Sequence, residues 1–355
     1  MAKQNIELPI NTDLLTQVQE EYYAVVDDFI PQDIANQLLA DANRLHSDGH
    51  FQQHYFQFGG ALLKKPNVRC NDLGLDFFLQ LTLLPLIMPH STRHNLLKVF
   101  ELDLSNPDKL DLYDLGIWKK VVSDMGPSFI RRIDELDQKM SAGPPSLSLQ
   151  TNTPPAIKLQ INTGGGSFPW HFDNPGPPNQ RILTCVIYLN PNWKEGDGGE
   201  IVLCPFLSPK IVIPPLHGRA VFFVSDRILH RVMPSKTRRV CFTMWCNGNG
   251  ANATNDVVLS RDALQFTSYD EAQSFFAKSP LQRVISRAVY SEEYLESLFE
   301  CLGSKNGMAG DGDGDAEGMT KEEKDLIIKQ HDASVLGIRK KLRPLIDELR
   351  RRKYS

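Results

Sequence analysis

The sequence predicts an α+β fold in which an all-β sandwich or barrel is flanked by α-helices. Between residues 156 and 247 it consists of short apolar or alternating runs, such as RILTCVIYLN and RAVFFVSD, divided by Gly, Pro, Asn and Asp. That pattern is typical of many short strands joined by turns. Before and after this region, apolar residues recur at spacings of three and four, which indicates helices.

The N-terminal part, residues 1–155, is expected to form a strand and a helical cover. YYAVVDDFI, residues 22–30, is rich in β-branched and aromatic residues and predicts a strand. A helix should follow with Pro31 near its start. Residues 73–140 are predicted to be mostly helical, and the composition of residues 141–155 indicates a loop.

The chain beyond the β-rich region is expected to return to helices. SYDEAQSFFAK and SEEYLESLFECL have helical patterns, and GSKNGMAGDGDGDAEG indicates a flexible linker. In the basic tail, apolar residues at spacings of three and four predict a last helix, bent at Pro344 and docked on the rest of the chain. Partner binding or nuclear targeting is the alternative for this tail. The expected domains are the cover (1–155), a β core (156–250), C-terminal helices (251–302), an acidic linker (303–320) and a basic tail helix (321–355).

Composition narrows the class of protein. The chain has 355 residues, 41% hydrophobic and 23% charged, with a formal net charge of −4, so nothing global favours a nucleic-acid partner. No apolar run is long enough to predict a membrane span. The six cysteines form no CxxC pair, which suits free thiols in a reducing compartment. We therefore expect a cytoplasmic protein, with the nucleus as the alternative.

The stretch SFPWHFDNPG places His171 two residues before Asp173. In a strand or extended turn, residues i and i+2 point to the same side, so both side chains can face one metal ion. A third ligand is expected from His230, at the exit of an apolar strand, with His217 in a Pro/Gly turn as its rival. Two histidines and one carboxylate form the ligand set of non-haem iron oxygenases. The alternative is a pair of ordinary polar residues on a surface turn. Surface roles are expected for the remaining histidines considered, His46, His50 and His54.

A buried cation is predicted close to this triad. Alternation along TRRVCFTMWC places four side chains on one face: Arg239, Cys241, Thr243 and Trp245. If this face lines the barrel, Arg239 needs an anionic partner, because an unpaired buried charge is costly. Thr243 and Tyr188 could contact the same anion, and such a cluster suits a dicarboxylate that is held at its far end. An internal salt bridge is the alternative.

The combination of motifs resembles a known family. His171-Phe-Asp173-Asn-Pro, Tyr188-Leu-Asn, SDR and His230 followed by Arg239 are similar to the Fe(II)/2-oxoglutarate prolyl 4-hydroxylases of the hypoxia-inducible-factor type. Protist relatives of these enzymes modify a ubiquitin-ligase adaptor. The resemblance is strong over residues 157–246 and weaker over residues 22–72. It implies a double-stranded β-helix, or jelly-roll, core.

The resemblance also implies roles for individual residues. His171, Asp173 and His230 would bind Fe(2+), while Arg239 and Tyr188 would bind the distal carboxylate of 2-oxoglutarate, with Thr243 lining that pocket. Arg181 would lie at the substrate rim, a role that rests on the resemblance alone. From the alternation along its strand, Arg181 is expected on the face opposite Tyr188.

The activity that the resemblance implies is hydroxylation of a prolyl residue in a protein or peptide. It would be coupled to oxidative decarboxylation of 2-oxoglutarate by O2 to succinate and CO2, with L-ascorbate as a supporting reductant and oxygen sensing as a role. A non-prolyl or small-molecule substrate is one alternative, and a non-catalytic metal-binding scaffold is another. The presence of Asp173 argues against a halogenase, which needs that coordination position for halide.

Two departures from the family pattern affect these expectations. Where the family places a tyrosine about ten residues before the first ligand, this chain has Gln160, Ile161 and Asn162. Residues 73–155 are longer than expected and unlike the family, so the identity of the substrate does not transfer. Separately, residues 311–322 have acids at EF-hand spacing but lack the required glycine and incoming helix, which favours a linker over a calcium site.

Overall fold

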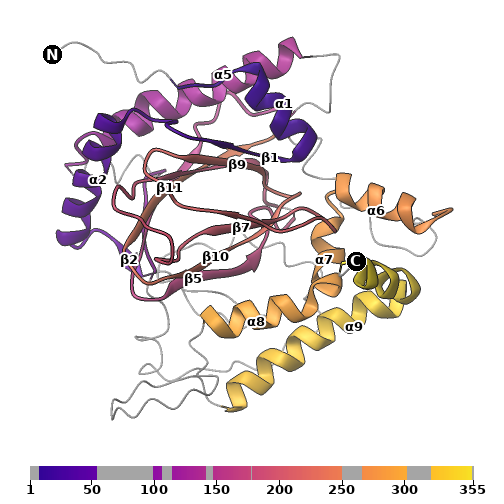
Figure 1. The fold of residues 1–355 in the computed structure, drawn as a ribbon. Coiled ribbons are helices and arrows are strands. Elements are labelled where there is room, and N and C mark those ends of the chain that lie inside the picture. Colours follow the sequence, from indigo (N-terminus) through magenta and orange to yellow (C-terminus); the bar gives the residue numbers. More distant parts are fainter. Residues whose placement is uncertain are drawn as a thin grey trace.

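The computed structural model describes residues 8–53, 99–105, 114–140, 147–176, 178–249, 266–301 and 321–353. Its centre is a pair of antiparallel β-sheets that face each other, with helices outside both (Figure 1). This arrangement of two facing sheets with flanking helices confirms the predicted α+β class with a jelly-roll core.

The larger sheet has seven strands and the smaller sheet four. The spatial order in the larger sheet is β1 (Tyr23–Val26), β9 (Ala220–Val224), β6 (Arg181–Tyr188), β11 (Arg239–Asn247), β4 (Ala156–Asn162), β3 (Val99–Asp103) and β2 (Gln52–Gln53). The order in the smaller sheet is β5 (Gly166–His171), β10 (Leu229–Ser235), β7 (Ile201–Cys204) and β8 (Ile211–Ile213).

Strand alternation divides the larger sheet into an outer and an inner face. On β11, Val240, Phe242 and Met244 belong to the apolar core between this sheet and the N-terminal helices. Cys241 instead packs with Tyr188 in the smaller core between the two sheets. The side chains predicted for the pocket therefore point into the barrel.

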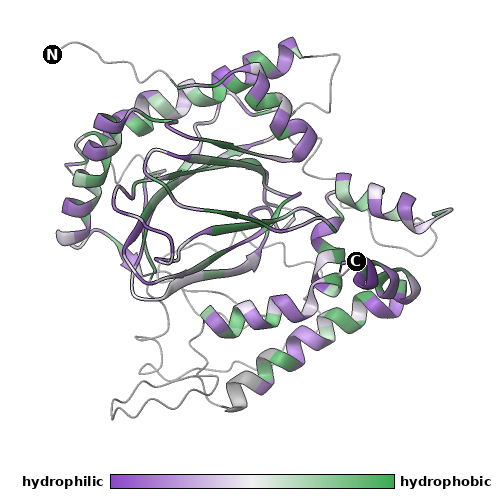
Figure 2. Cartoon of the chain, viewed as in Figure 1, coloured by the Kyte–Doolittle hydropathy of each residue, from purple (hydrophilic) through white to green (hydrophobic). Residues whose placement is uncertain are grey.

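The outer face of the larger sheet is covered by helices from the first part of the chain (Figure 1). These are α1 (Thr12–Glu21), α2 (Gln32–Ser47), α4 (Trp118–Lys120), the π-helical turn η2 (Val121–Met125) and α5 (Gly126–Lys139). Their buried apolar residues belong to the core against this sheet. Figure 2 shows that these helices combine hydrophobic and hydrophilic residues.

The C-terminal helices form a second core against the smaller sheet. They are α6 (Tyr269–Lys278), α7 (Gln282–Val289), α8 (Ser291–Cys301) and α9 (Lys321–Arg352). Helix α9 is docked by buried Ile346 and Leu349 and by polar contacts of its last turn, including Lys353 Nζ to Glu293 Oε2 at 2.9 Å. It is kinked at Leu342, two residues before Pro344.

Several predictions from the sequence can be compared with the fold. The strand within residues 22–30 and the helix after Pro31 are confirmed. The helical prediction for residues 73–140 is wrong at β3, because Val99–Asp103 alternates and pairs along its length with β4. Residues 54–98, the linker and the acidic repeat at 311–320 lie outside the described residues.

The structure also describes five of the six cysteines and the apolar character of the helices. Cys185, Cys204, Cys241, Cys246 and Cys301 are free and buried, as expected, and Cys70 lies outside the described residues. Within the part of the chain that the structure covers, no helix is both long and apolar enough to cross a membrane.

Candidate active site

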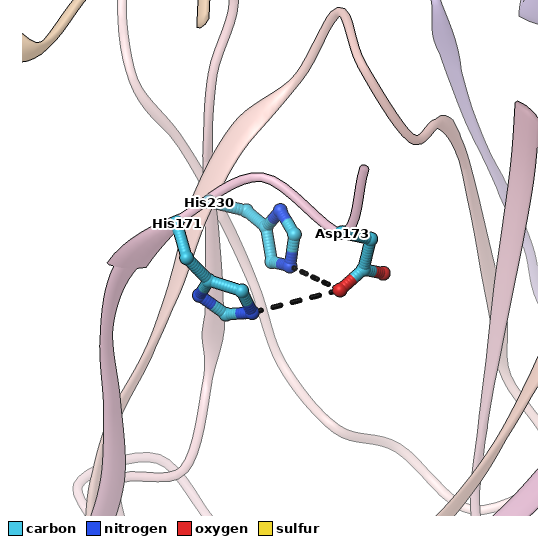
Figure 3. Close-up of side chains that lie close together, drawn as sticks. All are labelled: His171, Asp173 and His230. Carbon is cyan, nitrogen blue, oxygen red and sulfur yellow. Dashed lines mark ion pairs between the residues drawn. The ribbon is translucent and has the colours of Figure 1, made fainter. Parts of the chain in front are cut away.

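The three predicted ligands come together between the sheets. His171 ends β5, Asp173 follows in the next extended residues, and His230 lies on β10 directly opposite His171 in the strand pairing. Figure 3 shows both rings pointing toward one oxygen of the carboxylate. Among the described residues this is the one group of His, Cys, Asp or Glu that could hold a metal, with ligand atoms within 4.8 Å of one another. His217 is remote from this site, with Nε2 3.1 Å from Asn36 Oδ1 on α2.

The side chains are oriented so that each presents its ligand atom. Asp173 Oδ1 lies 3.6 Å from His171 Nε2 and 3.7 Å from His230 Nε2. On the other side of each ring, Nδ1 lies 2.8 Å from Pro169 O in His171 and 3.1 Å from Ile228 O in His230. A carbonyl oxygen can only accept, so Nδ1 carries the proton and Nε2 keeps its lone pair for a metal.

The electrostatics of the triad favour the protonation states that metal binding requires. Burial lowers the pKa of His230 to about 4, so its ring is neutral at pH 7. Burial alone would raise the pKa of Asp173, but the nearby His230 and His171 outweigh it and bring the pKa below its ordinary value. A neutral imidazole and an ionised carboxylate are the forms that bind divalent metals.

The second oxygen of Asp173 is held by two donors that sequence reasoning did not assign to the site. Asp173 Oδ2 accepts from Thr184 Oγ1 at 2.7 Å and from Trp245 Nε1 at 2.9 Å. Thr184 is in turn 2.9 Å from Ser225 Oγ. The sequence does carry a usable signal, because alternation along β11 places Trp245 on the face of Arg239 and alternation along β6 places Thr184 on the face of Tyr188. These contacts turn Oδ1 toward the histidines.

A buried guanidinium lies in the same barrel. Arg239 is 2% exposed, its Nε donates to Gly199 O at 2.7 Å, and its Nη1 is 3.2 Å from Cys241 Sγ. No carboxylate of the described residues pairs with it, so the alternative of an internal salt bridge is not realised there. Gly199 has φ +78°, and a Cβ there would meet Arg239 Cδ at 2.8 Å, so only glycine leaves the guanidinium in place.

Tyr188 adds a hydrogen-bond donor beside the Arg239 guanidinium, so that the two side chains together can bind an anion. Its ring lies 5.0 Å from the guanidinium carbon of Arg239, and its buried hydroxyl has no hydrogen-bond partner among the described residues. Burial raises the pKa of this phenol, so it remains a donor. Thr243 is also buried, on β11 beside Tyr188's strand, in register with Val186 of β6. A buried cation and an unused donor fit the distal carboxylate of a dicarboxylic acid.

The expected face of Arg181 is wrong. Its guanidinium carbon lies 4.3 Å from the centroid of the Trp245 ring, and its Nη1 is 3.5 Å from Asp173 O. The reason is a bulge between β6 and β11: Cys246 pairs with Leu183, but Asn247 pairs with Arg181, which leaves Ile182 as the extra residue. Strict alternation fails there, and Arg181 joins the side of Trp245 and the metal ligands.

Comparison with known proteins agrees with this geometry. Residues 157–247 match the profile of the 2OG-Fe(II) oxygenase superfamily. Human prolyl hydroxylase EGLN3 is 37% identical over 84 residues, which are 23% of this chain and 35% of that protein. Human Egl nine homolog 1 is 34% identical over 84 residues, 23% of this chain and 20% of that protein. The chain thus spans about a third or less of the length of these curated relatives.

One solved structure is similar over almost the whole chain. The crystal structure of prolyl 4-hydroxylases from Phytophthora capsici superposes with a TM-score of 0.66 and 28% identity, covering 97% of this chain and 92% of that one. The similarity therefore includes the flanking helices as well as the barrel. Residues 157–247 therefore form a domain that matches the 2OG-Fe(II) oxygenase superfamily, and prolyl hydroxylases are among the proteins to which the chain is similar.

Proposed function

We propose that this protein is an Fe(II)/2-oxoglutarate-dependent dioxygenase that hydroxylates a prolyl residue of a protein substrate. The observation that carries the proposal is the pairing of two demands within one barrel. A His–Asp–His cluster with both Nε2 atoms turned toward one carboxylate oxygen could hold a metal, and a buried Arg239 without a carboxylate partner among the described residues calls for an anion. Iron with 2-oxoglutarate meets both demands.

In such a reaction, different residues of the chain would bind the metal and the cosubstrate. His171, Asp173 and His230 would hold Fe(II), which when bound supplies the activation of O2 for oxidation of 2-oxoglutarate and of the substrate C–H bond. Arg239 would pair with the distal carboxylate, and the Tyr188 hydroxyl would donate to it. Thr243 would line the space beside Arg239. The apolar lining of the barrel excludes bulk water, which strengthens each of these polar contacts.

Prolyl hydroxylation is the finer part of the proposal. It is supported by those relatives that are named prolyl hydroxylases. Arg181, stacked on Trp245 beside Asp173, is suited to hold a peptide backbone or side chain at the rim. A 2-oxoglutarate oxygenase with a non-prolyl substrate remains the second candidate. The free buried thiols suit action in the cytoplasm or the nucleus.

The test is a search for the modified residue. Purified protein would be incubated with Fe(II), 2-oxoglutarate, ascorbate and lysate proteins in air, with His171→Ala in parallel. Mass spectrometry should find proline-containing peptides that gain one oxygen only with wild-type protein and only when 2-oxoglutarate is present.

Each other outcome has a distinct meaning. Gain of oxygen at a residue other than proline would replace the substrate class and keep the oxygenase. No 2-oxoglutarate consumption under any of these conditions would overturn the proposed function. For Arg181, the Arg181→Ala variant should raise KM for the identified peptide more than it lowers 2-oxoglutarate turnover without peptide; the reverse would place Arg181 in support of the metal site.

A further inference from the structure

A row of polar side chains crosses the inner face of the larger sheet next to Arg239. Cross-strand pairing aligns one residue from each of four neighbouring strands: Glu101 on β3, Gln160 on β4, Cys241 on β11 and Tyr188 on β6. Gln160 Nε2 donates to Glu101 Oε1 at 2.9 Å, and Cys241 Sγ lies 3.6 Å from Gln160 Oε1. Cys241 touches Arg239, so the row connects a buried carboxylate to the guanidinium through neutral groups.

Lys158 lies beside this row, in register with Thr243 on β11. Its Nζ is 3.2 Å from Glu101 Oε2 and 5.5 Å from the centroid of the Trp245 ring. Both partners of this ion pair are largely buried, with side-chain exposures of 19% for Lys158 and 8% for Glu101. Trp245 itself donates to the metal-binding carboxylate of Asp173. Lys158 therefore contacts both the tryptophan next to the metal ligands and the row of side chains that reaches Arg239.

The charges of these groups suggest why the pair is present. Glu101 places a negative charge in the region that the proposed function assigns to a dianion, and it raises the pKa of the Cys241 thiol, which burial raises first. Lys158 cancels that charge. Among the named groups, Lys158 offsets Glu101 and Arg239 offsets Asp173, so a bound Fe(II) would leave two positive charges, which matches the two carboxylates of 2-oxoglutarate.

We infer that Lys158 is a positioning residue of the 2-oxoglutarate pocket, where it neutralises Glu101 and adds a second cation between Arg239 and the metal ligands. This inference rests on the proposed function. Gln160 is one of the three residues at the position where the family pattern has a tyrosine, and its amide donates to Glu101 Oε1 at 2.9 Å. The affinity for 2-oxoglutarate should therefore follow the net charge of the Lys158–Glu101 pair.

The experiment is a calorimetric titration of 2-oxoglutarate into Fe(II)-loaded protein under anaerobic conditions, which measures binding without turnover. Lys158→Met removes the cation of the Lys158–Glu101 pair and should raise Kd about tenfold or more. Glu101→Gln should lower Kd, and the double variant should return it to within about threefold of wild type. Lys158→Arg keeps the charge and should also bind like wild type.

A matched control is available in Lys210→Met. Lys210 Nζ also lies over a tryptophan ring, 5.3 Å from the centroid of Trp170, and 3.9 Å from the Glu293 carboxylate, but outside the barrel. This variant should leave Kd unchanged. If Lys158→Met proves too unstable to purify, the same test compares Glu101→Gln with the Lys158→Met/Glu101→Gln double variant. Glu101→Gln should then have the lower Kd for 2-oxoglutarate.

The two hypotheses fail separately. Wild-type protein that binds 2-oxoglutarate, together with Lys158→Met that binds it equally well, would overturn the role of Lys158 and leave the proposed function intact. An equal Kd for Glu101→Gln and the double variant would do the same. Wild-type protein with no saturable binding of 2-oxoglutarate would overturn the proposed function itself.

Discussion

The indole Nε1 of Trp245 donates a 2.9 Å hydrogen bond to Oδ2 of Asp173, the carboxylate whose other oxygen faces both histidines of the triad. Trp245 lies near the end of β11, six residues after Arg239 on the same inner face. One strand therefore contributes both the cation for the proposed cosubstrate and a donor that orients the metal-binding carboxylate. The two halves of the site are built on a single rigid element.

Replacing Trp245 with Phe should weaken metal binding. The substitution keeps an aromatic ring but removes the donor to Asp173 Oδ2, and loss of such an orienting partner typically lowers metal affinity about 10–100-fold. Titration of the metal-free protein with Fe(II) or Mn(II) would measure the change. Trp193→Phe is the matched control, because its Nε1 donates to Gly198 O at 2.8 Å, away from the triad. Equal affinities for wild type and Trp245→Phe would show that Thr184 alone orients the carboxylate.

Much of the site could be predicted because its spacing is local. His171 and Asp173 are two residues apart, so extended backbone alone brings them to one side. Arg239 and Trp245 share a strand face for the same reason. His230 could be preferred over His217 because a strand exit, unlike a Pro/Gly turn, delivers a side chain into a barrel.

What could not be predicted depends on pairing between distant segments. The bulge at Ile182 reverses the face of Arg181, and it exists only because β6 and β11 pair with one residue out of step. Lys158 and Glu101 are 57 residues apart, and β3 lies in a stretch whose apolar spacing resembled helix. The need for a counter-charge beside Arg239 was visible in the sequence, but the residue that would neutralise Glu101 was not.

Replacing Arg239 with Ala should selectively impair 2-oxoglutarate binding. Removing one partner of a buried charge pair costs about 2–5 kcal/mol, which corresponds to a Kd increase of more than tenfold. Metal affinity should persist, because Arg239 does not contact the triad. Anaerobic titration with 2-oxoglutarate tests this, with the exposed neighbour Arg238→Ala as control. Unchanged affinity in Arg239→Ala would place the anion elsewhere.

The metal-free protein should lose stability as the pH falls from about 6.5 to about 4. The His230 pKa is about 4 in the folded chain, against an ordinary 6.5, so the unfolded state binds more protons in that window. The stability contributed by neutral, buried His230 is complete above pH 6.5 and is lost through this window, by about 3 kcal/mol. Urea unfolding at several pH values would measure it. His230→Asn should flatten the curve, and parallel curves for variant and wild type would contradict the assignment.

The last helix should contribute substantially to stability. Leu349 on α9 is fully buried in the core that also contains Trp170 and Phe172, the neighbours of His171. Leu349→Ala should lower the free energy of unfolding by about 2–5 kcal/mol, because it leaves a cavity. Leu336→Ala on the same helix, where the side chain is 66% exposed, should change it by less than about 0.5 kcal/mol. If both variants unfold at the same urea concentration as wild type, α9 is not part of the cooperative fold.

The most direct test of the central claim is formation of succinate from 2-oxoglutarate in the presence of Fe(II) and O2 by a pair of histidine variants. His230→Ala removes a ligand of the triad, whereas His217→Ala removes a ring whose Nε2 lies 3.1 Å from Asn36 Oδ1 on α2, outside the triad. We predict that His230→Ala abolishes succinate formation and sharply weakens iron binding, and that His217→Ala retains both near the wild-type level. An active His230→Ala variant, or an inactive His217→Ala variant that still folds, would contradict the assignment of the metal site.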